Sequence, residues 1–182
     1  MKTVFLDYQT FSQGLNLSSL NQTVDELTLY TTTSPAQIIA RCQNAEIILT
    51  NKVELTREIL NQLPQLKLIC ITATGINNVD IQAARELNIA ITHVSGYAKN
   101  SVAQYVFSQL LAYYSQVEHH NGNCQHGLWQ KSTTFCFHGN GSNELAGKAI
   151  AIIGYGALGK KVADIASAFD MQVLIAERPN TE

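Results

Sequence analysis

Short apolar runs alternate with segments of helical periodicity along the first half of the chain. The apolar runs are bounded by polar and turn residues, which is typical of strands. The predicted strands are residues 3–8, 26–32, 45–50, 66–73 and 89–94. Predicted helices begin at Ser34-Pro35 and at Thr56, and a third covers residues 79–87. This alternation predicts an open, doubly wound α/β domain, and the nearly continuous apolar run 66–73 is typical of a parallel strand covered on both faces.

The second half of the chain has a different pattern. After an expected hinge at residues 95–98, Val102, Val106, Leu110 and Tyr113 recur at helical spacing. Neighbouring apolar residues widen that face, so we expect a helix that is buried nearly all round. Residues 118–143 are polar and glycine-rich, which favours a helix end followed by a long surface loop that Trp129 anchors. Two further strands, 149–153 and 171–176, are expected to flank one helix.

Composition narrows the class of protein. Of the residues, 46% are hydrophobic and 14% are charged, and the net charge is -2. The sequence has no basic run and no apolar stretch of bilayer length, which argues against nucleic-acid and membrane partners. An early charge at Asp7 argues against a signal peptide, so a cytoplasmic protein is expected. Its widely spaced cysteines and the adjacent pair His119-His120 do not suggest a metal site.

The strongest chemical motif follows the apolar run 149–153. It is Gly154-x-Gly156-x-x-Gly159, and a helix pattern comes directly after it. Gly154 permits a tight turn, Gly156 lets a pyrophosphate approach the backbone, and Gly159 allows close packing of helix on strand. Glu177 ends the next strand, where an acid would bind the ribose hydroxyls of NAD and repel the 2′-phosphate of NADP. The neighbouring Arg178 keeps NADP open as the less favoured cofactor.

Several stretches in order along the chain resemble the D-isomer-specific 2-hydroxyacid dehydrogenases, particularly the glycerate dehydrogenase and hydroxypyruvate reductase branch. The matching segments are 49–53, 73–80, 94–97, 100–104, 144–148, the glycine motif and 173–178. The resemblance implies a flavodoxin-like substrate domain at residues 1–97. It also implies that residues 98–182 form the first part of a Rossmann NAD-binding domain, with the active site in the cleft between the domains.

The resemblance also implies roles for individual residues. Backbone amides of Thr74 and Gly75 would bind the substrate carboxylate, and Val102 would pack against the nicotinamide. Amides of Ala157 and Leu158 would bind the pyrophosphate. From the residues alone, Thr74-Gly75 is equally well a simple turn.

Two further features of the substrate half stay open. Lys52, at another strand end, would help to attract an anionic substrate, although a surface lysine is the commoner interpretation. Asn77 and Asn78 are interpreted as capping and turn residues of the helix that follows them.

The family's catalytic residues have no counterpart in this sequence. Its substrate-binding Arg and its acid/base His, paired with a Glu, lie further along the nucleotide domain than residue 182, and no histidine here stands at a matching position. We therefore assign no catalytic residue and expect the chain to be an inactive amino-terminal portion of an NAD-dependent dehydrogenase. Its substrates would be small 2-keto or 2-hydroxy acids of the hydroxypyruvate, glycerate or glyoxylate type, and the intact protein would form a homodimer. A non-catalytic truncated product or interaction module is the alternative.

Overall fold

A computed structural model describes residues 1–12, 14–139 and 141–176. Within it the chain divides into two compact units, Met1–Ser95 and a second that begins at Gly96.

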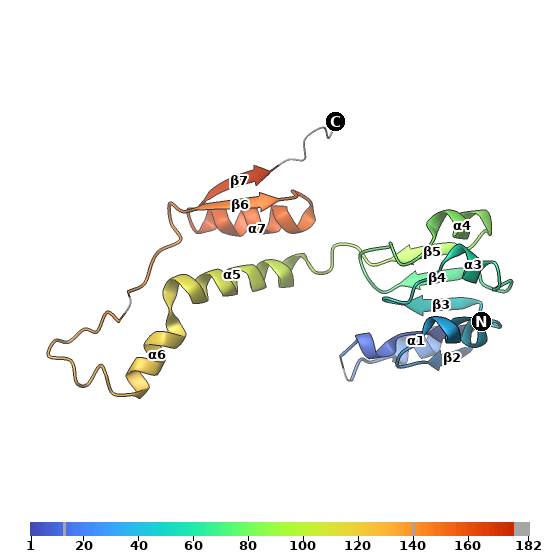
Figure 1. The fold of residues 1–182 in the computed structure, drawn as a ribbon, viewed down its shortest axis with the longest axis horizontal. Helices are drawn as coiled ribbons and strands as arrows, with labels where there is room; N and C mark the ends of the chain where they lie inside the picture. The colour runs from blue at the N-terminus through green and yellow to red at the C-terminus, as the bar shows by residue number, and fades with distance from the viewer. Residues whose placement is uncertain (13, 140, 177–182) are drawn as a thin grey trace. The chain divides into compact units, whose positions relative to one another are not determined.

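Unit 1 contains a five-stranded parallel sheet in the order β2-β1-β3-β4-β5 (Figure 1). Its strands are β1 (Lys2–Phe5), β2 (Glu26–Leu29), β3 (Ile47–Thr50), β4 (Leu68–Ile71) and β5 (Ala90–His93). Its helices are η1 (Tyr8–Thr10), α1 (Ser18–Thr23), η2 (Pro35–Gln37), α2 (Ile38–Cys42), α3 (Arg57–Leu60) and α4 (Ile81–Glu86). This is the flavodoxin-like strand order, and the predicted doubly wound α/β fold is confirmed.

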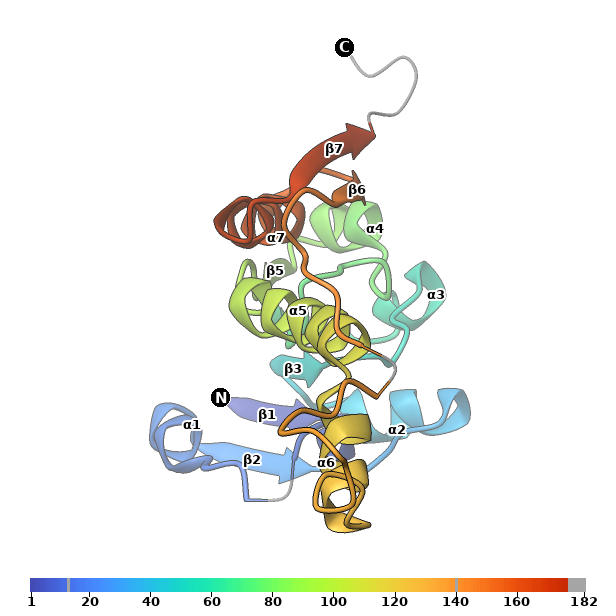
Figure 2. The same cartoon turned by 90° about the vertical axis from the view of Figure 1, so that its left-hand side faces the viewer.

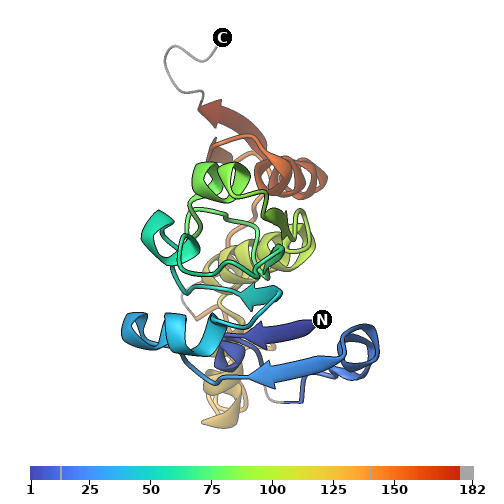
Figure 3. The same ribbon diagram turned by 90° about the vertical axis from the view of Figure 1, so that its right-hand side faces the viewer.

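Helices cover both faces of this sheet. Figure 2 shows α1 on one side of the strands and α2, α3 and α4 on the other, and Figure 3 shows the same layers from the opposite direction. β3 is buried along its whole length because its side chains alternate between the two layers. Ile48 packs into the larger core beneath α2–α4, and Ile47 and Leu49 pack with Phe5 on the α1 side.

Local hydrogen bonds define the starts of two helices. As predicted, Ser34 precedes the first turn, and its amide donates to Gln37 Oε1 at 3.0 Å. The expectation for Asn77 and Asn78 was wrong in part, because Asp80 caps α4 by accepting a hydrogen bond from the Ala83 amide at 2.8 Å. Asp80 is the residue directly before the helix, so its carboxylate lies next to the free amides of the first turn, whereas Asn77 and Asn78 lie too far upstream.

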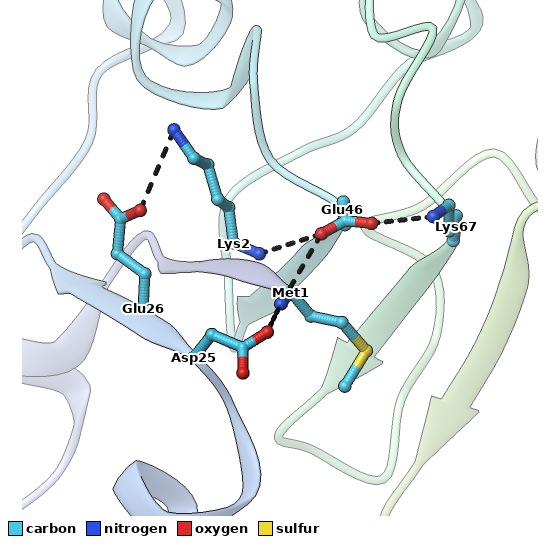
Figure 4. A network of polar contacts seen from close by, with 6 residues as sticks. All are labelled: Met1, Lys2, Asp25, Glu26, Glu46 and Lys67. Carbon is cyan, nitrogen blue, oxygen red and sulfur yellow. Dashed lines mark hydrogen bonds and ion pairs between the residues drawn. The ribbon is translucent and has the colours of Figure 1, made fainter.

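Charged groups gather where the strands of unit 1 begin (Figure 4). Glu46 Oε2 accepts a hydrogen bond from the Lys2 amide at 3.0 Å, and Glu46 Oε1 lies 2.7 Å from Lys67 Nζ. The amino terminus of Met1 pairs with Asp25. The hydrogen bond from Lys67, reinforced by the Lys2 amide, lowers the pKa of Glu46 from its ordinary value. Because all these groups face solvent, each pair contributes only modestly to stability.

Unit 2 contains two parallel strands, β6 (Ala149–Ile153) and β7 (Gln172–Ala176). Its helices are α5 (Lys99–Ser115), α6 (Val117–Gln125) and α7 (Ala157–Ala168). The core lies between α5, α7 and one face of the strands, where Ala103, Phe107, Ile152 and Ala166 are buried. Phe107 also stacks on Phe169, with ring centroids 5.5 Å apart.

The expectation that α5 is buried nearly all round was wrong. Among the described residues of α5, only Ala103 and Phe107 are buried, whereas Tyr113 is 77% exposed. Helical periodicity shows which side chains could be buried, but within unit 2 α7 covers one face of α5 only. The segment expected to contain a helix end and a polar loop begins with the nine-residue helix α6, which is separate from α5. Trp129 is itself half exposed, and its indole donates to the Phe135 carbonyl at 3.0 Å.

The two-stranded sheet has one covered face. Figure 1 shows α7 lying along one side of β6 and β7. On the strands, Ile153 is 89% exposed. Leu174, whose register partner Ala151 lies on the same face as Ile153, is also exposed. The described part of unit 2 therefore presents an apolar sheet face to solvent. Among the described helices, none is long and apolar enough to cross a bilayer.

Candidate functional site

In unit 1, the predicted substrate-binding residues lie on two neighbouring loops. Lys52 follows β3 and Thr74-Gly75 follows β4, and these strands are adjacent in the sheet. The loops are tied together, because the Leu55 amide donates to the Asn78 carbonyl at 2.8 Å and Asn78 Nδ2 donates to the Val53 carbonyl at 3.2 Å. The structure thus brings the three predicted residues to one edge of the sheet, at the carboxyl ends of its strands.

The loop after β4 offers backbone donors. Thr74 and Gly75 are exposed, and none of the hydrogen bonds among the described residues uses their amides. The Thr74 carbonyl contacts His93 Nδ1 at 3.1 Å, which joins the loop to the end of β5. Two free amides on a loop held from both sides can bind a carboxylate without first breaking other hydrogen bonds.

The loop that carries Lys52 is held by a buried carboxylate. Asp7, only 5% exposed, accepts hydrogen bonds from the amides of Asn51 (2.9 Å), Lys52 (2.6 Å) and Val53 (3.3 Å) and from Thr50 Oγ1 (3.3 Å). These donors replace the water that a buried carboxylate loses. The Lys52 side chain is exposed and has no ion-pair partner among the residues that the structure describes. Sequence reasoning missed Asp7 because the predicted strand 3–8 included it, whereas β1 ends at Phe5.

In unit 2, the glycine motif forms the predicted turn between β6 and α7. Gly154 has a φ of +95°, a conformation that side chains disfavour. A Cβ atom on Gly159 would lie 2.3 Å from the Gly154 carbonyl oxygen, so α7 approaches the turn closely only because this residue lacks one. A Cβ atom on Gly156 would meet no atom within 4 Å, so the space in front of this residue is open to a ligand.

The first turn of α7 supplies free amides beside this space. α7 begins at Ala157, and no hydrogen bond among the described residues uses the amides of Ala157 or Leu158. Lys160, by contrast, donates to the Gly156 carbonyl at 2.9 Å. Free amides at the amino end of a twelve-residue helix, next to an open glycine, fit a pyrophosphate group.

Two further residues were predicted to bind the cofactor, Val102 and Glu177. Val102 lies on α5 next to the buried Ala103 and is partly exposed, with 39% of its surface accessible. Glu177 lies outside the described residues. Within those residues, no group of three or more His, Cys, Asp or Glu side chains could hold a metal ion.

The family model for the D-isomer specific 2-hydroxyacid dehydrogenase catalytic domain matches residues 9–169. The chain belongs to this family. Among curated relatives, a putative 2-hydroxyacid dehydrogenase of Haemophilus influenzae is 37% identical over 97% of this chain and 56% of its own length. The glycerate dehydrogenase of Methylorubrum extorquens is 36% identical over 95% of this chain and 54% of its own length. The chain thus spans about half the length of the curated relatives that it matches.

Solved structures show the same fold. The 2-hydroxyacid dehydrogenase from Ketogulonicigenium vulgare has a TM-score of 0.76 at 20% identity, covering 99% of this chain and 55% of that one. The D-lactate dehydrogenase from Aquifex aeolicus, complexed with NAD and lactic acid, has a TM-score of 0.71 at 24% identity and covers 100% of this chain and 53% of that one. Relatives of this family are named dehydrogenases and reductases, which are oxidoreductases.

Proposed function

We propose that the chain is the amino-terminal part of an NAD-dependent D-2-hydroxyacid dehydrogenase. Its substrates are small 2-keto and 2-hydroxy acids of the hydroxypyruvate, glycerate or glyoxylate type. Residues 1–97 are the substrate domain, and residues 98–182 are the first part of the cofactor domain. The observation that carries this proposal is the glycine turn, whose open Gly156 adjoins the free amides of Ala157 and Leu158.

The cofactor-binding residues act through backbone groups and packing. The amides of Ala157 and Leu158 donate to the pyrophosphate, and the absence of a side chain at Gly156 permits its approach. Val102 packs against the nicotinamide, and Glu177 binds the ribose hydroxyls, which favours NAD over NADP. The bound nicotinamide supplies or accepts the hydride.

The proposed substrate-binding residues offer hydrogen-bond donors and a positive charge to an anionic substrate. The amides of Thr74 and Gly75 bind the substrate carboxylate, and the ammonium of Lys52 adds an attractive positive charge. No described residue is assigned to polarise the keto group or to transfer a proton. In this proposal the catalytic Arg, Glu and His are not among residues 1–182, and the chain alone is inactive.

The exposed side of α5 supports a proposal about assembly. Tyr105 and Tyr113 are exposed on this helix, and Val117 is exposed where α6 begins. Aromatic side chains of this kind are enriched at protein interfaces. We propose that the intact protein is a cytoplasmic homodimer that binds neither nucleic acid nor a membrane.

Cofactor binding and turnover test the proposal separately. NADH fluorescence is titrated with the 182-residue chain and with Gly156→Ala, which places a Cβ atom in the space in front of the turn. The variant is expected to bind NADH about tenfold more weakly, which corresponds to about 1.4 kcal/mol. Gly122→Ala is the matched control, because Gly122 is also in unit 2 and its Cβ atom would likewise meet no atom within 4 Å.

NADH oxidation is then followed with hydroxypyruvate and with glyoxylate. We expect binding without turnover. Turnover above background would show that residues within 1–182 fill the catalytic roles. Equal binding by Gly156→Ala and the parent chain would contradict the assignment of the glycine turn. Failure to bind NADH at all would favour a non-catalytic product or interaction module.

A further inference from the structure

Unit 1 contains a pocket of which the proposed function uses only one lining residue, Lys52. Its volume is about 430 Å³, which suits a small organic ligand. Its lining includes Thr32, Pro35, Lys52, Val53, Glu54 and Ile59. Thr74 and Gly75 do not line it, so the pocket lies on the other side of the Lys52 loop from the proposed substrate amides.

The pocket lies where this type of sheet usually binds ligands. In the strand order β2-β1-β3-β4-β5, β2 lies on one side of β1 and β3 lies on the other side. The direction of winding therefore reverses between β1 and β3, and ligands of open α/β sheets bind outside the carboxyl ends of the strands at such a point. Asp7 follows β1, Thr32 follows β2 and Lys52 follows β3, and all three line the pocket.

The walls of the pocket are fixed without a ligand. Asp7 holds the wall that contains Lys52 and Val53 through the backbone hydrogen bonds described above. Arg41 holds the wall that contains Thr32, because its Nη1 donates to the Thr32 carbonyl at 2.5 Å and its guanidinium lies 4.0 Å from the centre of the Tyr30 ring. A preformed pocket loses little freedom when it binds a ligand.

The lining combines two opposite charges with an apolar surface. Lys52 and Glu54 are exposed, and neither forms an ion pair within the part of the chain that the structure describes. The third charged group, Asp7, already accepts hydrogen bonds from three backbone amides. Pro35, Val53 and Ile59 contribute apolar lining between the polar groups. A ligand that matches this lining has a carboxylate, an ammonium group and an apolar body.

We propose that this pocket binds a small aliphatic α-amino acid. Lys52 pairs with its carboxylate, Glu54 pairs with its ammonium group, and its side chain packs against Val53 and Ile59. This inference goes beyond the proposed function and shares only Lys52 with it. Because both ligands use Lys52, an amino acid in the pocket weakens binding of the keto acid.

Leucine and two analogues test the proposal on the ¹⁵N-labelled 182-residue chain. Leucine carries both charges, 4-methylpentanoate lacks the ammonium group, and 3-methylbutylamine lacks the carboxylate. Leucine is expected to shift the amide signals of Val53, Glu54 and Ile59. Each analogue is expected to bind about tenfold more weakly, as fits the loss of one charge-assisted contact. Absence of leucine-induced shifts, or analogue binding as tight as that of leucine, would overturn the proposal.

Substitution of Lys52 and of Glu54 tests whether these two charges bind leucine. Lys52→Met and Glu54→Gln should each weaken leucine binding about tenfold, since each removes one ion pair. Lys67→Met and Glu58→Gln are matched controls, because both residues belong to unit 1 and neither lines the pocket. Leucine binding that survives both pocket variants would contradict the assignment.

A titration with hydroxypyruvate on the same sample separates the two hypotheses. Hydroxypyruvate is expected to shift the amide signals of Thr74 and Gly75. Unchanged signals at these two residues would contradict the proposed function, whereas the evidence for leucine binding would not be affected.

Discussion

The two units bury their parallel strands to different extents. In unit 1, helices cover both faces of a five-stranded sheet, and Leu6, Ile48 and Ile69 are fully buried. In unit 2, two strands have helices on one face only, and Ile153 is 89% exposed. Parallel sheets are normally covered on both faces. The described chain therefore contains one complete hydrophobic core and one half-covered core, and the proposed cofactor turn belongs to the half-covered one.

The largest expected effect is a difference in independent folding. Residues 1–95, expressed separately, should give a dispersed NMR spectrum and a cooperative thermal transition, since their core is covered on both faces. Residues 96–182 should self-associate, because an exposed apolar sheet face and an open strand edge favour association between chains. Circular dichroism and sedimentation velocity measure both properties.

Substitution of Ile153 is the control for this difference. Ile153→Lys places a charge on the exposed face and should reduce self-association of residues 96–182 without loss of helix content. A monodisperse, cooperatively folded parent fragment would contradict the contrast between the units.

Features that depend on neighbouring residues were predicted from the sequence, and features that depend on residues far apart along the chain were not. The strands of unit 1 and the glycine turn were predicted because apolar runs and glycines act over a few residues. The burial of α5 was mispredicted, since periodicity does not say how many elements pack on a helix. Asp7 was missed because its hydrogen-bond donors lie more than forty residues away along the chain. Local patterns therefore predicted the elements and the turn, but not the contact that holds the Lys52 loop.

Within unit 2, close packing at the turn is the next test. Gly159→Ala should destabilise unit 2 by about 3 kcal/mol, because the new Cβ atom would lie 2.3 Å from a backbone oxygen that cannot move independently. Gly156→Ala should leave the free energy of unfolding within about 0.5 kcal/mol, since its Cβ atom meets open space. Urea unfolding followed by circular dichroism measures both variants. Similar stabilities for the two would show that the turn relaxes, and that the two glycines do not have separate roles.

The corresponding test in unit 1 concerns the buried carboxylate. Asp7→Asn should lower the free energy of unfolding of unit 1 by about 2 kcal/mol, since the amide group cannot replace the charged acceptor of several backbone hydrogen bonds. Amide hydrogen exchange of Asn51 and Lys52 should become faster than in the parent chain. Asp25→Asn is the control, because the Asp25 side chain is 86% exposed. Unchanged exchange at Asn51 and Lys52 in Asp7→Asn would show that other contacts hold the loop.

The smallest expected effect is a pH dependence that is specific to unit 1. Lys67 and the Lys2 amide lower the pKa of Glu46 in the folded state below its ordinary value of 4.5. The ionised carboxylate therefore contributes stability above pH 4.5, and this contribution is lost as the pH falls through the lowered pKa. The melting temperature of unit 1 should decrease as the pH falls from 4.5 through the lowered pKa of Glu46. The melting temperature of the Glu46→Gln variant should decrease less over the same pH range.

Glu26→Gln serves as the control, because the Glu26 carboxylate lies 3.8 Å from Lys2 Nζ and its described contacts include no backbone amide donor. It should therefore retain the pH dependence of the parent chain. If the melting temperatures of Glu46→Gln and the parent chain changed equally with pH, solvent would screen the ion pairs of Glu46 completely. The Glu46 network would then contribute nothing measurable to the stability of unit 1, and apolar burial would account for more of the difference between the units.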